Sequence, residues 1–184
     1  MKIKKKMMIG LLVVAALFIT FGFITSWKRG QSDLETVSYV DLERYQGLWY
    51  DVASFPQRFQ SGCHNTTARY TLHKKGYVIV ENQCNKGGIE GKLSSISGKA
   101  TVVKNTGNAK LKVQFFWPFK ADYWIIMLDE DYRYAVVSHP TKKYLWILSR
   151  TPQMDEEVMD SICATLQEKG FDLSNLQKVV HKTE

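Results

Sequence analysis

Short, evenly spaced segments of strand-forming residues run through the middle of this 184-residue chain and limit the folds it can adopt. Turn signals such as Lys75-Gly76 and Gly87-Gly88 separate the segments. Eight such strands joined by short turns favour an antiparallel barrel or sandwich over a parallel sheet with crossover helices. An eight-stranded barrel has an interior just large enough for one small ligand. The strands are predicted at residues 49–55, 66–72, 77–83, 94–103, 110–117, 123–128, 134–138 and 144–149.

One helix and a short last strand are predicted after these strands. Acidic residues at 155–157 suit the positive end of a helix, and the pair Lys169-Gly170 suits its end. Residues 176–180 are expected to form a strand laid against the rest of the sheet. Apolar residues between these signals recur at helical spacing and form one stripe, at Val158, Met159, Ile162, Cys163 and Leu166.

Positive charge is concentrated at the start of the chain. The formal net charge is +7, but six of the lysines and arginines lie in the first 30 residues, which hold no acidic residue. The rest of the chain carries 19 basic and 18 acidic residues. Because a nucleic-acid-binding protein concentrates positive charge on its folded domain, we expect no nucleic-acid partner.

The first 30 residues resemble a membrane-directed leader. Residues 7–27 are apolar apart from two threonines and one serine, and as a helix they would span roughly 31 Å, about one hydrocarbon core. Both an uncleaved signal anchor and a cleaved signal peptide fit this pattern. Positive charge before the apolar run directs the following domain away from the cytoplasm. We therefore expect a leader at 1–30, a polar linker at 31–39 and a folded domain at 40–184, membrane-anchored or secreted and facing the periplasm or cell exterior.

Two cysteines flank a predicted hairpin. Pairing across the turn near Lys74 places Cys63 and Cys84 almost opposite each other, at a spacing compatible with a disulfide. Closing a loop of roughly 20 residues contributes about 3 kcal/mol, and export supplies the oxidising compartment. The alternative is a reactive thiol at Cys63, beside His64. Cys163 is interpreted as a small buried apolar residue of the helix.

Matching motifs lie at the two ends of the strand region. Gly47 and Trp49 open the first strand, and Arg150 begins an Arg-Thr-Pro sequence after the last one. An indole and a guanidinium placed in this way can stack and close one mouth of a barrel, a contact worth about 0.5 to 2 kcal/mol. With residues 128–135 between them, these motifs resemble the lipocalins, in particular the bacterial outer-membrane lipocalins and the apolipoprotein D branch.

The resemblance covers roughly residues 45–180 and implies a specific fold. That fold is mainly β, an eight-stranded antiparallel up-and-down barrel with one C-terminal helix and a short last strand. The resemblance also implies binding of fatty acids or lysophospholipids and a role in envelope stress. A lipid anchor would need a cysteine just after the leader, whereas the first cysteine is Cys63. The sequence departs from its lipid-anchored relatives at this point.

Strand alternation predicts which side chains face the barrel interior. Ala53 and Phe55 are assigned to the face of Trp49, and the structural residues are Gly47, Trp49 and Arg150. The alternative for each inward residue is that it only fills the core. The candidate ligand-binding residues are Ala53, Phe55, Tyr70, Val78, Val80, Val113, Phe115, Trp117, Lys120, Trp146 and Leu148.

An aromatic turn is expected at the open mouth. Residues 116–123 connect two strands yet carry four aromatic residues, where turns are normally polar. Such residues suit an entrance for lipid chains, or an interface with a second copy of the chain. Lys120 among them is a candidate partner for an anionic head group.

No motif in the sequence indicates catalysis, a metal site or a cofactor site. The histidines at 64, 73, 139 and 181 are scattered, and neither a phosphate-binding loop nor a nucleophile elbow is present. We therefore predict a non-enzyme that stores or transports a small amphipathic lipid, a fatty acid or lysophospholipid, in the cell envelope. The alternatives are a lipid-modifying or isomerase-type enzyme using Cys63, and a protein-interaction module acting through the aromatic turn.

Overall fold

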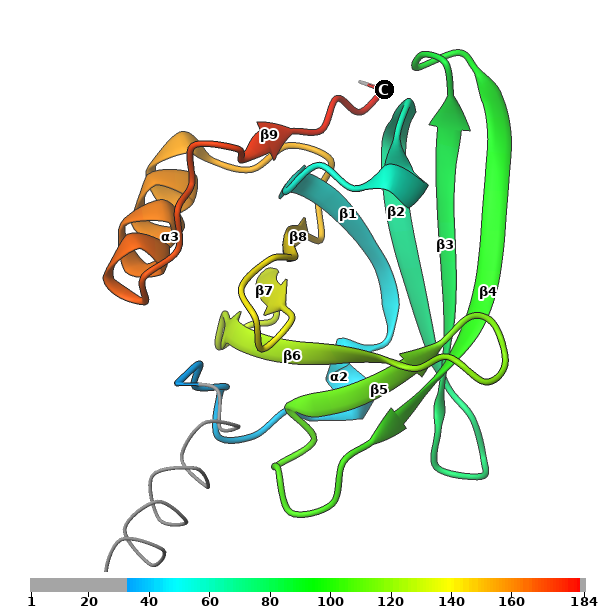
Figure 1. Cartoon of the computed structure of the whole chain (residues 1–184), viewed down its shortest axis with the longest axis vertical. Helices are drawn as coiled ribbons and strands as arrows, with labels where there is room; N and C mark the ends of the chain where they lie inside the picture. The colour runs from blue at the N-terminus through cyan, green and yellow to red at the C-terminus, as the bar shows by residue number, and fades with distance from the viewer. Residues whose placement is uncertain (1–32, 183–184) are drawn as a thin grey trace, which may run out of the picture. The chain divides into compact units, whose positions relative to one another are not determined.

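Eight antiparallel strands close into a barrel in the computed structural model, which describes residues 33–182 (Figure 1). Each strand pairs with its neighbour in sequence, and β1 also pairs with β8, which closes the barrel. This confirms the predicted fold class. The strands are β1 (Gly47–Ser54), β2 (Cys63–Leu72), β3 (Val78–Lys86), β4 (Lys92–Val102), β5 (Lys110–Gln114), β6 (Ala121–Leu128), β7 (Tyr134–Ser138) and β8 (Leu145–Ser149).

The remaining elements are short except for one helix. Helix α2 (Leu42–Tyr45) precedes β1, the 3-10 turn η2 (Arg58–Gln60) follows it, and strand β9 (Gln177–Lys178) pairs with β1. Helix α3 (Glu156–Glu168) begins at Asp155, whose carboxylate accepts a hydrogen bond from a backbone N–H of the first turn. The helix is where the sequence predicts it. None of the helices among the described residues is long and apolar enough to span a membrane, and the predicted leader at 1–30 lies outside those residues.

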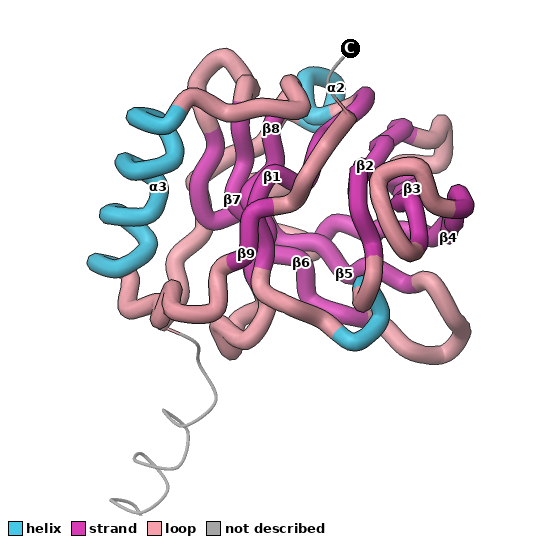
Figure 2. Tube along the Cα trace, turned by 90° about the horizontal axis from the view of Figure 1, so that it is seen from above, coloured by secondary structure: helices cyan, strands magenta, loops and turns pink. Residues whose placement is uncertain are grey.

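Residues 33–182 form two apolar cores, one on each side of the barrel wall. The first fills the barrel interior, and the second lies between the outer face of the wall and α3, whose Ile162 and Leu166 are fully buried. Figures 1 and 2 show α3 outside the barrel. Strand β7 contributes to both cores, since Val137 faces the interior and Val136 faces the helix. This double burial explains why the sequence of β7 is almost continuously apolar.

The wall between β1 and β2 is completed by a segment from the other end of the chain. Direct pairing of β1 with β2 extends only from Gly47 to Tyr50. Beyond it, residues 177–181 lie between the two strands: the Val179 N–H donates to the Val52 carbonyl (3.0 Å), and the Asn65 N–H donates to the Val180 carbonyl (2.9 Å). Figure 2 shows β9 beside β1. We call residues 177–181 the seam segment.

Candidate functional site

At one end of the barrel, Arg150 covers Trp49. The guanidinium carbon lies 3.8 Å from the indole centroid, and Trp49 is completely buried. Nη1 of Arg150 donates to the carbonyls of Gln46 and Leu48, each at 2.9 Å. Burial lowers the pKa of Arg150 below its usual value. The predicted stacking is confirmed, and it lies at the end of the barrel where β1 begins, which we call the closed end.

Gly47 supplies the backbone conformation found at this contact. Its φ of +94° lies in the left-handed region that favours glycine, whereas an added Cβ would lie 3.4 Å from Nη1 of Arg150, an ordinary contact distance. The structure therefore gives a physical reason for a glycine two residues before the tryptophan.

Most of the residues predicted to line the interior lie in the interior core. They differ in burial, because Phe115 and Trp146 near the open end are only partly buried. Phe115 packs against Gly98, where an added Cβ would meet the phenyl ring at 2.6 Å. Their contact with a ligand stays a prediction. The interior members of the predicted set are Tyr70, Val78, Val80, Val113, Phe115, Trp146 and Leu148.

The prediction that Ala53 and Phe55 share the face of Trp49 is wrong. Strand β1 has a bulge against β8, where Asp51 pairs with Leu148 and Ala53 already pairs with Ile147. The extra residue reverses the alternation, so Ala53 and Phe55 pack in the outer core beneath α3. Sequence alternation cannot show such an insertion.

Trp117 and Lys120 also lie outside the interior core. Strand β5 ends at Gln114, earlier than predicted, and the turn that follows projects its aromatic side chains into solvent. Trp117 is 87% exposed and Phe119 76% exposed, and Phe116 and Lys120 are exposed as well. We call residues 116–120 the aromatic rim.

Three tyrosines that the sequence did not single out as a group meet inside the barrel. The hydroxyl of Tyr123 lies 2.8 Å from that of Tyr45 and 2.9 Å from that of Tyr70. Burial raises all three pKa values, that of Tyr70 to about 12, so the hydroxyls stay protonated at neutral pH. Tyr123 could have been found by extending the alternation of β6, whereas Tyr45 comes from the short helix α2, which no strand pattern predicts.

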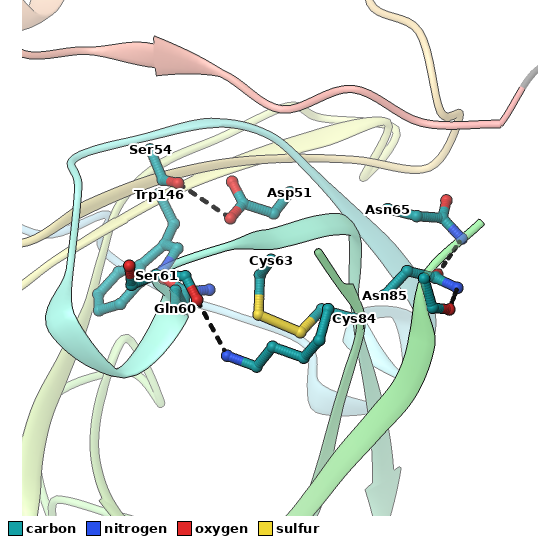
Figure 3. Close-up of a disulfide and its surroundings, with 11 residues drawn as sticks. Asp51, Ser54, Gln60, Ser61, Cys63, Asn65, Cys84, Asn85 and Trp146 are labelled. Atoms are coloured by element: carbon teal, nitrogen blue, oxygen red, sulfur yellow. Dashed lines mark hydrogen bonds between the residues drawn. A yellow bond between two sulfur atoms is a disulfide. The ribbon is translucent and has the colours of Figure 1, made fainter. Parts of the chain in front are cut away.

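Cys63 and Cys84 form a disulfide, as predicted, with Cα atoms 5.4 Å apart (Figure 3). Cys63 pairs with Lys86 in the ladder, and a bulge between His64 and Thr67 brings the two cysteines together diagonally. The bridge occupies the thiol on which the enzyme alternative depends. Cys163 is free and half-buried on α3, and burial raises the pKa of its thiol.

A cavity of about 560 Å³ lies beside this disulfide, between β1, the 55–62 connection, the start of β2 and the seam segment. Most of its lining residues are polar, which distinguishes it from the interior core. Asp51 and Gln57 line it and are both buried. Figure 3 shows Asp51 beside Ser54, whose hydroxyl donates to the Asp51 carboxylate at 3.0 Å.

Burial sets the charge of Asp51. Removal from water raises the pKa of this carboxyl from 3.8 to about 7, although the hydrogen bond from Ser54 opposes the shift. The sequence carried a signal for it, since an acidic residue two positions after Trp49 falls on the interior face. Within residues 33–182, no group of three or more histidine, cysteine or acidic side chains is placed to hold a metal ion.

Comparisons with known proteins agree with this architecture. The family model of the lipocalin-like domain matches residues 40–181. The chain is 38% identical over 156 residues to temperature-induced lipocalin-1 of Arabidopsis thaliana, covering 80% of this chain and 83% of that protein. It is 41% identical over 140 residues to outer membrane lipoprotein Blc of Escherichia coli K12, covering 75% and 77%.

A solved structure shares the fold. Insecticyanin from the tobacco hornworm Manduca sexta matches with a TM-score of 0.67 at 22% identity, over 82% of this chain and 85% of that chain. At this identity, the similarity concerns the fold alone.

Proposed function

Because the chain belongs to the lipocalin family, we propose that it binds one small amphipathic lipid, a fatty acid or lysophospholipid, in its barrel. The observation that carries the proposal is the state of Phe115 and Trp146, which face the interior near the open end and are only partly buried. Burying an acyl chain against these two side chains would contribute about 0.8 kcal/mol of binding free energy per methylene group. The aromatic rim would form the entrance.

Storage or transport in the cell envelope is the role we propose for this binding. Support comes from the similarity to an outer membrane lipoprotein of Escherichia coli and from the apolar residues 7–27 of the sequence. An oxidising compartment also agrees with the Cys63–Cys84 disulfide. Catalysis through Cys63 has no support from the structure, since that thiol is bridged.

Native mass spectrometry of the purified protein tests binding directly. We expect one co-purifying lipid per chain, released as a fatty acid or lysophospholipid. A protein without bound lipid that also fails to bind added lipid in calorimetric titration would contradict the proposal.

Two substitutions then separate chain contact from head-group contact. Trp146→Ala should weaken a fatty acid and the matching alcohol alike, because the contact it removes from the acyl chain is apolar and its indole N–H donates to the Gln60 side chain. Lys120→Ala should weaken the acid more than the alcohol, by about 0.5 to 2 kcal/mol, because an exposed charge is partly screened. Lys104→Ala is the matched control, since this exposed lysine follows β4 at the closed end. Equal effects of Lys120→Ala on acid and alcohol would remove Lys120 from the site.

Self-association through the aromatic rim is a second candidate, favoured by the exposure of Phe116, Trp117 and Phe119. Sedimentation at increasing protein concentration, with tryptophan quenching as a probe of Trp117, tests it. A chain that stays monomeric throughout excludes it.

A further inference from the structure

Asp51 is an acidic residue on the interior side of the barrel wall. It pairs with Leu148, an interior residue, and partners in an antiparallel ladder share a face. Its side chain is only 3% exposed and interacts electrostatically with Tyr70 of the interior core. Asp51 therefore lies where the polar cavity meets the barrel interior.

The hydrogen-bonding capacity of this region is only partly used. One carboxylate oxygen of Asp51 accepts from Ser54, whereas Oδ1 has no partner among residues 33–182. The same is true of both amide atoms of Gln57, a second buried residue of the cavity. Buried polar atoms are nearly always paired in folded proteins, so three unpaired atoms around one cavity indicate a place for a polar group from outside the chain. The terminal torsion of a carboxylate is soft, which allows either oxygen of Asp51 to turn toward that group.

We propose that the cavity beside Asp51 holds the polar end of the bound lipid and selects a hydrogen-bond donor, an ammonium or hydroxyl group, over a carboxylate. This inference rests on the proposed function and narrows its ligand class to lipids with an ammonium or hydroxyl head group. It places the head group at Asp51, in place of the contact with Lys120 that is tested above for a fatty acid. The cavity volume of about 560 Å³ falls within the range of small-molecule sites. An ionised carboxylate only accepts hydrogen bonds, while an ammonium supplies three donors and the opposite charge.

Cations around the cavity do not reverse this preference. Arg58 and Lys178 line it, but both are exposed, and Lys178 lies 4.0 Å from the carboxylate of Glu156. Solvent screens exposed charges strongly and buried ones weakly, so Asp51 dominates the electrostatics of the inner part of the cavity.

The preference depends on the charge of Asp51, so it changes with pH. The raised pKa of about 7 makes Asp51 mostly anionic well above neutrality and mostly neutral below it. Two histidines face the same region: His64 lines the cavity, and His181 of the seam segment donates from Nε2 to the backbone oxygen of Asp51 at 2.8 Å. The pKa of His181 is lowered by burial. Protonation of His181 in acid adds positive charge and weakens ammonium binding further, in the same direction as protonation of Asp51.

The test compares three ligands of one chain length: dodecylamine, dodecanol and dodecanoic acid. Each is titrated calorimetrically below its micellar concentration into the full-length protein, at about pH 8.5 and about pH 5.5. The wild type should bind the amine about tenfold more tightly than the acid at the higher pH. The ratio of amine to alcohol affinity should fall several-fold at the lower pH.

The isosteric variant Asp51→Asn should bring amine and acid affinities within about threefold of each other and remove the pH dependence of the amine-to-alcohol ratio. Glu81→Gln is the matched control, because this carboxylate is exposed on β3, outside the cavity lining, and should leave all affinities unchanged. Asp51→Asn removes a buried charge, so we expect it to fold, and a thermal melt verifies this.

The outcomes separate the inference from the proposed function. If all three ligands bind but Asp51→Asn alters no preference, or the wild type prefers the acid at the higher pH, the inference is overturned and the proposed function stands. If none of the three binds the wild type, the proposed function fails and the inference fails with it.

Discussion

Arg150 is expected to be one of the most costly side chains to remove from the barrel. Besides the indole of Trp49, it binds four backbone carbonyls: those of Arg44 (2.8 Å), Gln46 and Leu48 (2.9 Å each) and Tyr132 (3.2 Å). The bond to Arg44 is exposed, and water replaces it in a variant. The three part-buried bonds contribute about 1 kcal/mol each, and the contact with the indole about 1 kcal/mol. Arg150→Ala should therefore lower the free energy of unfolding by about 3 to 4 kcal/mol.

A lysine at the same position separates charge from geometry. Arg150→Lys keeps a cation above Trp49 but loses the planar fork that reaches several carbonyls at once, so we expect a loss of about 1 to 2 kcal/mol. Arg69→Ala is the matched control, since this arginine is exposed on β2. It should change stability by less than about 0.5 kcal/mol.

Urea unfolding followed by tryptophan fluorescence gives the three free energies. Lipid affinity of the folded variants should stay close to that of the wild type, because the contact lies at the closed end. A free energy of unfolding for Arg150→Ala within about 0.5 kcal/mol of the wild-type value would refute the reasoning. A large loss of lipid affinity with unchanged stability would also refute it and would place Arg150 in the binding site.

Three further predictions concern the rest of the barrel. Folding raises the pKa of Asp51 from 3.8 to about 7, so the stability it contributes is full below pH 3.8 and is lost as the pH rises through about 7. Compared with the wild type, Asp51→Asn should therefore raise the free energy of unfolding by about 2 to 4 kcal/mol at alkaline pH and change it little at acidic pH, as thermal melts can measure. Alkylation of the native protein without reductant should label Cys163 and leave Cys63 and Cys84 unmodified, and labelling of either would contradict the bridge. Gly47→Ala should cost about 1 to 3 kcal/mol in urea unfolding because φ is +94° there, and an unchanged midpoint would show that the turn relaxes.

The features that follow from local pattern were predictable from the sequence. Strand alternation and turn residues are local, and they identified the eight strands as well as interior residues such as Tyr70 and Val113. The helix was predictable because its apolar residues recur at helical spacing and form a single buried face, which can be read from a short stretch of sequence. The contact between Trp49 and Arg150 could be predicted although the two residues are distant in sequence. Their motifs lie at the two ends of the strand region, as the family resemblance implies.

Features that depend on one extra residue or on distant segments were not predictable. The bulge in β1 adds a single residue that leaves no mark in composition, yet it moves Ala53 to the outer core. The polar cavity is formed by segments as far apart as Asp51 and Val179, which 128 positions separate, and no local pattern joins them. Alternation places Asp51 on the same face as Trp49, but no strand pattern shows that a polar cavity lies beside it.

The seam segment also determines when the barrel can be completed as the chain is synthesised. Asp51 and His181 are in contact although 130 residues separate them, and the paired residues of β1 and β8 lie 92 to 99 residues apart. Contacts between such distant residues form late, because the intervening chain must first be brought together. A nascent chain that has emerged only as far as α3 carries all eight barrel strands but not the residues that fill the gap between β1 and β2. Until residues 177–181 arrive, the backbone groups of Val52 and Asn65 at this gap have no protein partner, and an emerging chain is open to pairing with another strand there.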